Sequence, residues 1–198
     1  MVPLPDIPRS DWAARRERWP DPAEVLRELG VEAGTSLVDV GAGAGFFALP
    51  AAEVVGPAPV YVIHPDGTLL DELEAAALDA GLENVTTVSG SASELSTLLP
   101  ERVDVVLVAS GFHAVEEPTA FAEQVARSLR PGGRFVVVEW RDGTTEEGGG
   151  GPLEPDAEDR IPPERMETLV APAGLEVAER VDLPPEHYGL VFMRGHDL

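Results

Sequence analysis

The sequence predicts an α/β fold built on a doubly wound parallel sheet. Short runs rich in β-branched residues alternate with longer stretches of helical periodicity along the chain. The first such run, Leu37 to Val40, leads directly into a glycine-rich turn and then into a helical pattern, as at the first strand of sheets of this class. We see no internal repeat in the 198 residues, so a single domain accounts for the chain.

The elements are expected in a regular order. Asp11 to Leu29 predicts one or two helices, so residues 1–30 form a helical arm or lid and residues 31–198 form the domain. The five strands expected from β-branched runs are Leu37 to Val40, Val60 to Ile63, Val85 to Val88, Val103 to Ala109 and Phe135 to Glu139. The helices expected between them are Gly45 to Val55, Gly67 to Ala80, Ser93 to Leu98 and Pro118 to Leu129.

The C-terminal part is expected to close the sheet. Residues 142–159 are rich in glycine and acid and predict a mobile loop. Pro162 to Ala171 follows as a helix. Leu175 to Leu183 and His187 to Arg194 then predict a closing pair of strands, and Pro184 and Pro185 join them.

The charge is strongly negative. The chain has 36 Asp and Glu against 14 basic residues, all Arg, for a formal net charge of −22. Such a surface repels nucleic acid and anionic membranes, so neither is expected as a partner. The composition is typical of salt-accumulating halophiles, in which concentrated salt screens an acidic surface, and we favour that interpretation because the acids are spread along helix faces and loops. The 43% of hydrophobic residues is enough for a packed core.

Several sites and locations are excluded by composition. There is no Cys, which excludes disulfides, thiolate metal sites and cysteine nucleophiles, and no metal site is predicted. The apolar runs are too short to span a membrane, and Met1 to Ser10 lacks a secretory pattern. We therefore expect a cytoplasmic protein.

The glycine turn carries the functional information. Asp39, Gly41, Gly43 and Gly45 form a D-x-G-x-G-x-G pattern at the carboxyl end of the first strand, where open α/β sheets bind ligands. The dinucleotide pattern G-x-G-x-x-G instead needs glycine at Phe46. A nucleotide-dependent oxidoreductase is therefore disfavoured but stays an alternative.

With this turn the sequence resembles the class I S-adenosylmethionine-dependent methyltransferases. Pro131-Gly132-Gly133 is similar to the turn before the family's fifth strand, and Phe112 to Pro118 looks like its segment after the fourth strand. The resemblance covers about residues 20 to 195 and is nearest to the branch with ubiquinone and menaquinone C-methyltransferases. It implies a Rossmann-like seven-stranded sheet of order 3-2-1-4-5-7-6 with helices on both faces and the last strand antiparallel. It also implies S-adenosylmethionine as cofactor and methyl transfer to a small-molecule acceptor.

The resemblance implies a set of cofactor-binding residues. Asp39 is placed to receive the cofactor's amino group, and the turn offers backbone contacts. The other positions follow the second, third and fourth strands. The full set is Asp39, Gly41, Ala42, Gly43, Gly45, His64, Pro65, Ser91, Ala92 and Ser110.

Two of these positions depart from the family. His64 stands where an acid normally holds the ribose hydroxyls, although Asp66 could substitute if Pro65 turns the chain inward. Ser91 stands where an Asp often accepts from the adenine amino group. The departures keep open a weak-binding or non-catalytic member of the fold.

The acceptor side is predicted from the strand ends. His113 follows the fourth strand and is the candidate general base, although a histidine there also fits a packing or capping role. Phe112, Trp140, His187 and Tyr188 are the candidate acceptor-pocket residues, and edge packing is the alternative. A homodimer is compatible with the sequence.

Overall fold

The computed structural model describes residues 21–141, 155–183 and 186–195. Within them seven strands form one sheet of order β3-β2-β1-β4-β5-β7-β6. β7 runs antiparallel to β5 and β6, and the other neighbouring pairs are parallel. The predicted fold class and strand order are confirmed. The strands are β1 (Leu37–Val40), β2 (Val60–His64), β3 (Val85–Ser89), β4 (Val103–Ala109), β5 (Leu129–Trp140), β6 (Leu175–Leu183) and β7 (His187–Arg194).

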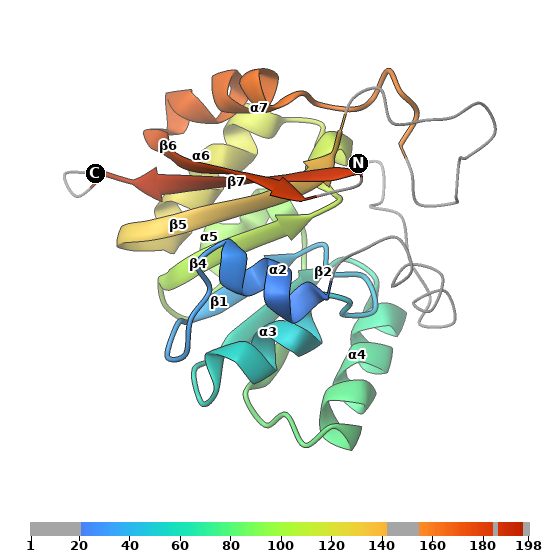
Figure 1. Ribbon diagram of the computed structural model, residues 1–198. Coiled ribbons are helices and arrows are strands. Elements are labelled where there is room, and N and C mark those ends of the chain that lie inside the picture. Colours follow the sequence, from blue (N-terminus) through green and yellow to red (C-terminus); the bar gives the residue numbers. More distant parts are fainter. Residues whose placement is uncertain (1–20, 142–154, 184–185, 196–198) are drawn as a thin grey trace.

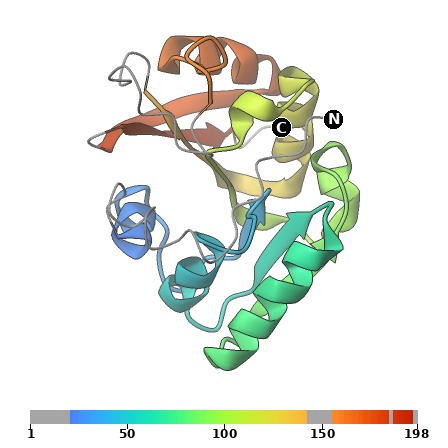
Figure 2. The same ribbon diagram turned by 90° about the vertical axis from the view of Figure 1, so that its right-hand side faces the viewer.

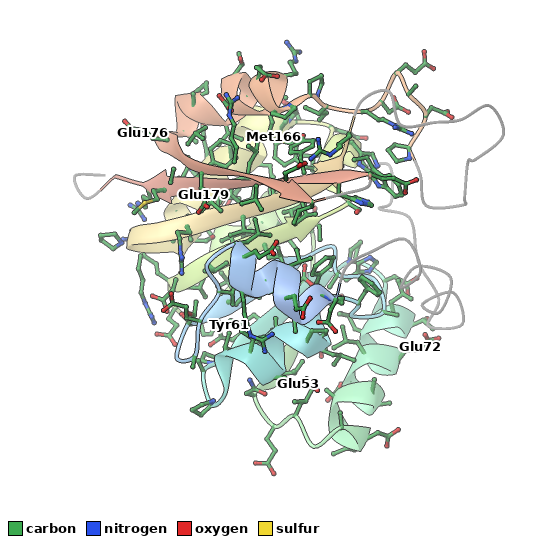
Figure 3. All side chains as sticks on the ribbon, viewed as in Figure 1. Glu53, Tyr61, Glu72, Met166, Glu176 and Glu179 are labelled. Carbon is green, nitrogen blue, oxygen red and sulfur yellow. The ribbon has the colours of Figure 1, made fainter. Side chains whose placement is uncertain are left out.

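Helices cover both faces of the sheet (Figures 1 and 2). One layer contains α2 (Pro22–Glu28), α3 (Ala48–Val55) and α4 (Gly67–Asp79), and the other contains α5 (Leu95–Leu98), α6 (Pro118–Ser128) and α7 (Pro163–Val170). Short 3-10 helices in the described ranges are η2 (Ala92–Glu94), η3 (Phe112–Ala114) and η4 (Ala171–Ala173). The outward faces are acidic: Glu53 of α3 and Glu72 of α4 are exposed, whereas Met166 of α7 is fully buried (Figure 3).

The alternation of side chains along β1 decides which residues face which layer. Leu37 packs in the core beneath α2, α3 and α4, whereas Val38 and Val40 pack in the core beneath α5, α6 and α7. Because successive side chains of a strand point to opposite faces, Asp39 shares the face of Leu37.

The same alternation holds in β5. Val136 and Val138 face the α2 layer, and Phe135 and Val137 face the α6 layer. Glu139 is therefore directed to the α6 side of the sheet, at the carboxyl end of its strand.

The amino ends of β1 and β4 are joined through Asp104. The N–H and hydroxyl of Ser36 donate to Asp104 Oδ2 at 2.9 and 2.6 Å, and Arg130 Nη1 donates to the same oxygen at 2.9 Å. Burial raises the pKa of Asp104, but the bonds from Ser36 and Arg130 outweigh it and hold that pKa below its ordinary value. The two central strands are thus fixed at the edge opposite the glycine turn.

The helix that follows the glycine turn starts later than predicted. α3 begins at Ala48, not Gly45, because Gly45 has a φ of 92° and cannot continue a right-handed helix. A Cβ at Gly45 would also lie 2.9 Å from Leu73 Cδ1 of α4. The glycine turn is therefore longer than the sequence pattern indicated.

The fifth strand starts earlier than predicted. Leu129 already pairs with Val103, and the ladder resumes with Arg134 opposite Val105. Residues 130–133, with the Pro131-Gly132-Gly133 motif, form a bulge in the strand, because four residues of β5 stand opposite the single residue Asp104 of β4.

Other boundaries differ slightly or fall outside the described residues. The predicted Ser93 to Leu98 helix is η2 followed by α5, and the predicted Pro162 to Ala171 helix is α7 followed by η4. Residues 1–20 of the predicted arm, residues 142–154 of the predicted loop, and the predicted turn residues Pro184 and Pro185 lie outside the described residues. In the described part of the chain, no helix is both long and apolar enough to cross a membrane.

Candidate functional site

A cavity of about 210 Å³ opens at the carboxyl ends of β1, β2 and β3. Its walls are mainly apolar side chains of these strand ends and of the segment from η3 to α6. The apolar wall is Val40, Ile63, Pro65, Ala92, Ala114, Val115, Ala120 and Phe121. The polar lining is Ser91, Ser93, Glu116, Glu117, Glu123, Gln124 and Arg127. Apolar walls with a few polar groups suit a flat heteroaromatic ring.

One polar wall residue is fixed in orientation. The N–H and hydroxyl of Ser96 donate to Gln124 Oε1 at 3.2 and 2.6 Å. This contact ties α5 to α6 and holds the far wall of the cavity in place.

The glycine turn borders the cavity at Gly41. Gly41, Gly43 and Gly45 have φ values of 77°, 53° and 92°. These values lie in the left-handed region, which other residues enter only at a cost, and glycine also leaves the backbone open to close approach by a ligand. The pattern of three glycines is thus required by the conformation of the turn.

Asp39 lies beneath this turn and is 1% exposed. It does not line the cavity, because Val40 occupies that face of β1. A ligand crossing the carboxyl end of β1 would have the cavity on one side and the Asp39 face on the other. The contact to a ligand amino group stays a prediction.

His64 is not a surface loop residue, since it is 2% exposed. Its Nδ1 accepts the N–H of Asp66 at 3.0 Å, and Asp66 Oδ1 in turn accepts the N–H of Thr68 at 2.7 Å and caps α4. The imidazole lone pair that a ribose hydroxyl would need is therefore already used. Of the two carboxylate oxygens of Asp66, Oδ1 is therefore already bonded to the first turn of α4.

Ser91 lines the cavity and is the N-cap of η2. Its Oγ accepts the N–H of Ser93 at 3.3 Å and lies 2.9 Å from Ser93 Oγ. Pro65 and Ala92 also line the cavity, whereas Ala42, Gly43, Gly45, His64 and Ser110 do not. The cavity thus brings together four of the predicted cofactor residues.

Ser110 has an unusual conformation. Its φ is 54°, and among the described residues it is the non-glycine residue with positive φ. Its N–H donates to the carbonyl of Val138 at 2.7 Å. The side chain is 7% exposed, and Ser110 Oγ has no hydrogen-bond partner in the part of the chain that the structure describes. Strain together with a buried hydroxyl at a strand end is typical of a functional position.

His113 is held by a residue that the sequence analysis missed. Its Nδ1 lies 3.2 and 3.1 Å from the two carboxylate oxygens of Glu139. Glu139 is 1% exposed and ends an otherwise apolar run, Phe135 to Val138. A charged residue at the carboxyl end of such a strand was the available signal. The contact itself joins residues on different strands and has no local pattern.

The four predicted acceptor residues do not form one pocket wall. Phe112 is fully buried among Phe121 and Phe135, with ring centroids 6.1 Å from each, so its side chain packs the core. Trp140 and His187 pair across β5 and β7 with ring centroids 4.2 Å apart.

Tyr188 faces the other side of the sheet. It stands opposite Glu139, and its hydroxyl donates to the carbonyl of Ile161. Burial, assisted by Glu139 and Glu164, raises the pKa of Tyr188, so the hydroxyl stays neutral. No group of three or more His, Asp and Glu in the described residues is placed to hold a metal ion.

A family model for the methyltransferase domain matches residues 38–137, which span the glycine turn, the cavity walls and His113. The chain belongs to this methyltransferase family. With the observed strand order, the match confirms the resemblance to class I S-adenosylmethionine-dependent methyltransferases.

This methyltransferase is similar to two curated methyltransferases. It is 28% identical over 118 residues to a demethylmenaquinone methyltransferase from Anoxybacillus flavithermus, covering 59% of this chain and 49% of that protein. It is 30% identical over 118 residues to a ubiquinone/menaquinone biosynthesis C-methyltransferase from Hahella chejuensis, covering 58% and 47%. The chain spans about half the length of these relatives.

Solved structures match over more of the chain. A SAM-dependent methyltransferase from Aquifex aeolicus has a TM-score of 0.79 and 26% identity and covers 95% of this chain and 94% of its own. The cyclase SpnF has a TM-score of 0.69 at 17% identity, covering 87% and 79%, which shows the fold alone. The methyltransferase fold therefore extends well beyond the residues that the family model matches.

Proposed function

We propose that this chain transfers the methyl group of S-adenosylmethionine to a small-molecule acceptor. The observation that carries the proposal is the apolar cavity beside the left-handed glycine turn at the carboxyl end of β1. S-adenosylmethionine supplies an activated methyl group when bound. The protein's task is then to position the acceptor and exclude water.

The residues present fit this cofactor in three respects. The apolar cavity walls suit the adenine ring, and Gly41 and Gly43 leave backbone open to close approach. Asp39 supplies a carboxylate for the charged amino group. The acids that line the cavity, Glu116, Glu117 and Glu123, favour a ligand of net positive charge.

The names of the curated relatives suggest the acceptor to test first. They are a demethylmenaquinone methyltransferase and a ubiquinone/menaquinone C-methyltransferase. A reduced, demethylated quinone is therefore the first acceptor to test for this chain.

Calorimetric titration tests the proposal. We expect saturable binding of S-adenosylmethionine, and no binding of NAD, in molar KCl. Binding of NAD alone would instead favour a nucleotide-dependent oxidoreductase. Absence of heat with both ligands would contradict the methyltransferase proposal.

Replacing Asp39 tests how the cofactor is held. Asp39→Asn should weaken S-adenosylmethionine binding by about tenfold or more, because a charge-assisted hydrogen bond is lost. Glu72→Gln, which removes one charge from the exposed face of α4, is the matched control and should leave affinity unchanged. Equal affinity of Asp39→Asn and wild type would exclude this role for Asp39.

A second candidate is a member of the fold that binds the cofactor weakly or is non-catalytic. The observation that favours it is the commitment of His64 Nδ1 and Ser91 Oγ to backbone N–H groups. Ser91→Asp restores an acid at a partly exposed cavity position. If this candidate is right, Ser91→Asp binds S-adenosylmethionine and the wild type does not.

A further inference from the structure

Glu139 is a carboxylate in a place where charge is costly. It is 1% exposed near the end of β5, and the four residues directly before it, Phe135 to Val138, are apolar. Removing a carboxylate from water is unfavourable unless hydrogen bonds and charges replace the water. The contacts of Glu139 therefore indicate why an acid is kept there.

Those contacts gather the turn after β4 around the carboxylate. Oε1 accepts the backbone N–H groups of Phe112 at 2.7 Å and His113 at 3.2 Å, and Oε2 accepts the N–H of Trp140 at 3.3 Å. The same two oxygens contact His113 Nδ1 at 3.2 and 3.1 Å. One carboxylate thus fixes both the backbone of η3 and the ring of His113.

The contact decides the tautomer of His113. A carboxylate only accepts hydrogen bonds, so Nδ1 must carry the hydrogen. In the neutral ring Nε2 is then the nitrogen with the free lone pair, and it is able to accept a proton. An imidazole held in this way by a buried acid is arranged as a general base.

The negative charges around His113 raise its pKa. Burial lowers the pKa of His113, but Glu139 on β5 and, less strongly, Asp159 in the segment before α7 outweigh it and raise that pKa above its ordinary value. Tyr188 on β7 faces Glu139 as a neutral hydroxyl. The ring therefore carries a proton at mildly acidic pH and loses it as the pH rises.

We propose that Glu139 is a positioning residue that orients His113 to take the proton of an acceptor hydroxyl. This rests on the proposed function. His113 precedes Ala114 and Val115, which line the cavity, and lies on the turn that follows β4. The O–H bond of the acceptor breaks, its proton moves to His113 Nε2, and the electron pair stays on the acceptor, which becomes the nucleophile. The proton later leaves His113 for solvent.

The proposal selects a class of acceptor. A phenol or hydroquinone is weakly acidic and needs such a base at neutral pH, whereas a tertiary amine does not. This chain should therefore methylate an acceptor with an aromatic hydroxyl, either at that oxygen or at the ring carbon that its ionisation activates. In the second case the hydrogen on that carbon then leaves as a proton to solvent, and the ring becomes aromatic again.

Nitrogen NMR of the ligand-free chain tests the dyad without any cofactor. The ¹⁵N shifts should report hydrogen on Nδ1 and a free lone pair on Nε2 for His113, whose signals are assigned by their loss in His113→Gln. Glu139→Gln should lower the pKa of His113, because the opposite charge that holds it above its ordinary value is removed. Hydrogen on Nε2 in the wild type would overturn the proposal, whether or not Glu139→Gln folds.

The pH profile of methyl transfer is the second measurement, with a hydroquinone as acceptor. The rate should rise with pH as His113 loses its proton, because the neutral ring is the active form. In Glu139→Gln this rise should move to lower pH, and the plateau should fall about tenfold or more. A variant that only loosened the structure would lower the plateau without moving the rise, and that result would overturn the proposal.

Two control variants separate the positioning of the His113 ring by Glu139 from the effect of nearby negative charge on its pKa. Asp159→Asn should lower the pKa of His113 slightly and leave its tautomer unchanged, because Asp159 acts on His113 by charge alone. Glu72→Gln, on the exposed face of α4, should change neither the pKa nor the tautomer of His113. If S-adenosylmethionine binds but Nε2 of His113 carries the hydrogen, the proposed function stands and this inference fails.

Discussion

At the scale of single residues, Ser110 shows a conflict between stability and function. It combines a left-handed backbone with a buried hydroxyl that lacks a partner among the described residues. Each feature costs about 1–3 kcal/mol. Such a residue is expected where a ligand supplies the missing hydrogen bond.

Ser110→Gly should therefore stabilise the chain and impair binding. Glycine adopts a φ of 54° without strain and removes the buried hydroxyl. We expect the free energy of unfolding to rise by about 1 kcal/mol and the affinity for S-adenosylmethionine to fall, as measured by urea unfolding and calorimetry.

Ser128→Ala is the matched control for Ser110. Ser128 is also buried, but its hydroxyl donates to the Gln124 carbonyl at 2.8 Å. Its replacement should lower stability slightly and leave cofactor affinity unchanged. If Ser110→Gly lowered the free energy of unfolding as much as Ser128→Ala does, the left-handed backbone at Ser110 would not be destabilising the protein.

Glu139 shows why some site residues escape sequence reasoning. His113 was predicted as a candidate base from its place after the fourth strand. Its partner lies 26 residues away on another strand, and no spacing rule links the two. The pair forms because β4 and β5 are neighbours and end at the same edge of the sheet.

At the scale of elements, the bulge at the start of β5 leaves no room for a side chain at Gly133. A Cβ at Gly133 would lie 2.9 Å from the carbonyl oxygen of Arg130 and 3.2 Å from that of Asp104. Backbone oxygens cannot move away as a side chain can, so β4 and β5 would have to separate there.

The same substitution at two glycines tests this account. Gly133→Ala should lower the free energy of unfolding by about 1–3 kcal/mol through overpacking. Gly67→Ala, at the first turn of α4, meets nothing within 4 Å and should be neutral or stabilising by up to about 1 kcal/mol. Thermal unfolding of both variants measures the difference, and equal melting temperatures would contradict the close approach.

Element boundaries were predicted less well than element identities. The pattern placed the start of the helix after the glycine turn at Gly45 and that of the fifth strand at Phe135. Both starts moved because glycine conformations and strand pairing fix them: Gly45 is left-handed, and Leu129 finds a partner in Val103. Periodicity shows which face of an element is buried, but it does not fix where the element begins and ends.

At the scale of the whole molecule, the charge of −22 should make stability depend on salt. Raising KCl from 0.01 to 1 M shortens the screening length from roughly 30 to 3 Å and weakens the repulsion among surface carboxylates. We expect the melting temperature to rise steadily over this range.

Sucrose at matched osmolality separates screening from general exclusion of solute. It should reproduce little of the rise, because it screens no charge. A melting temperature that does not change between 0.01 and 1 M KCl would show that the acidic surface carries no net repulsion, and would remove the physical basis for interpreting the composition as an adaptation to salt.

The sequence by itself determined the class of fold, the order of its elements and the place of the glycine turn. These depend on local rules, namely side-chain period and the conformational freedom of glycine, which act over a few residues. Only the tertiary structure decided that His64 uses its lone pair on Asp66, that Ser110 is strained and that Glu139 holds His113. Each of these depends on how a strand end or turn is placed in the fold, and such placement is set by packing of the whole sheet.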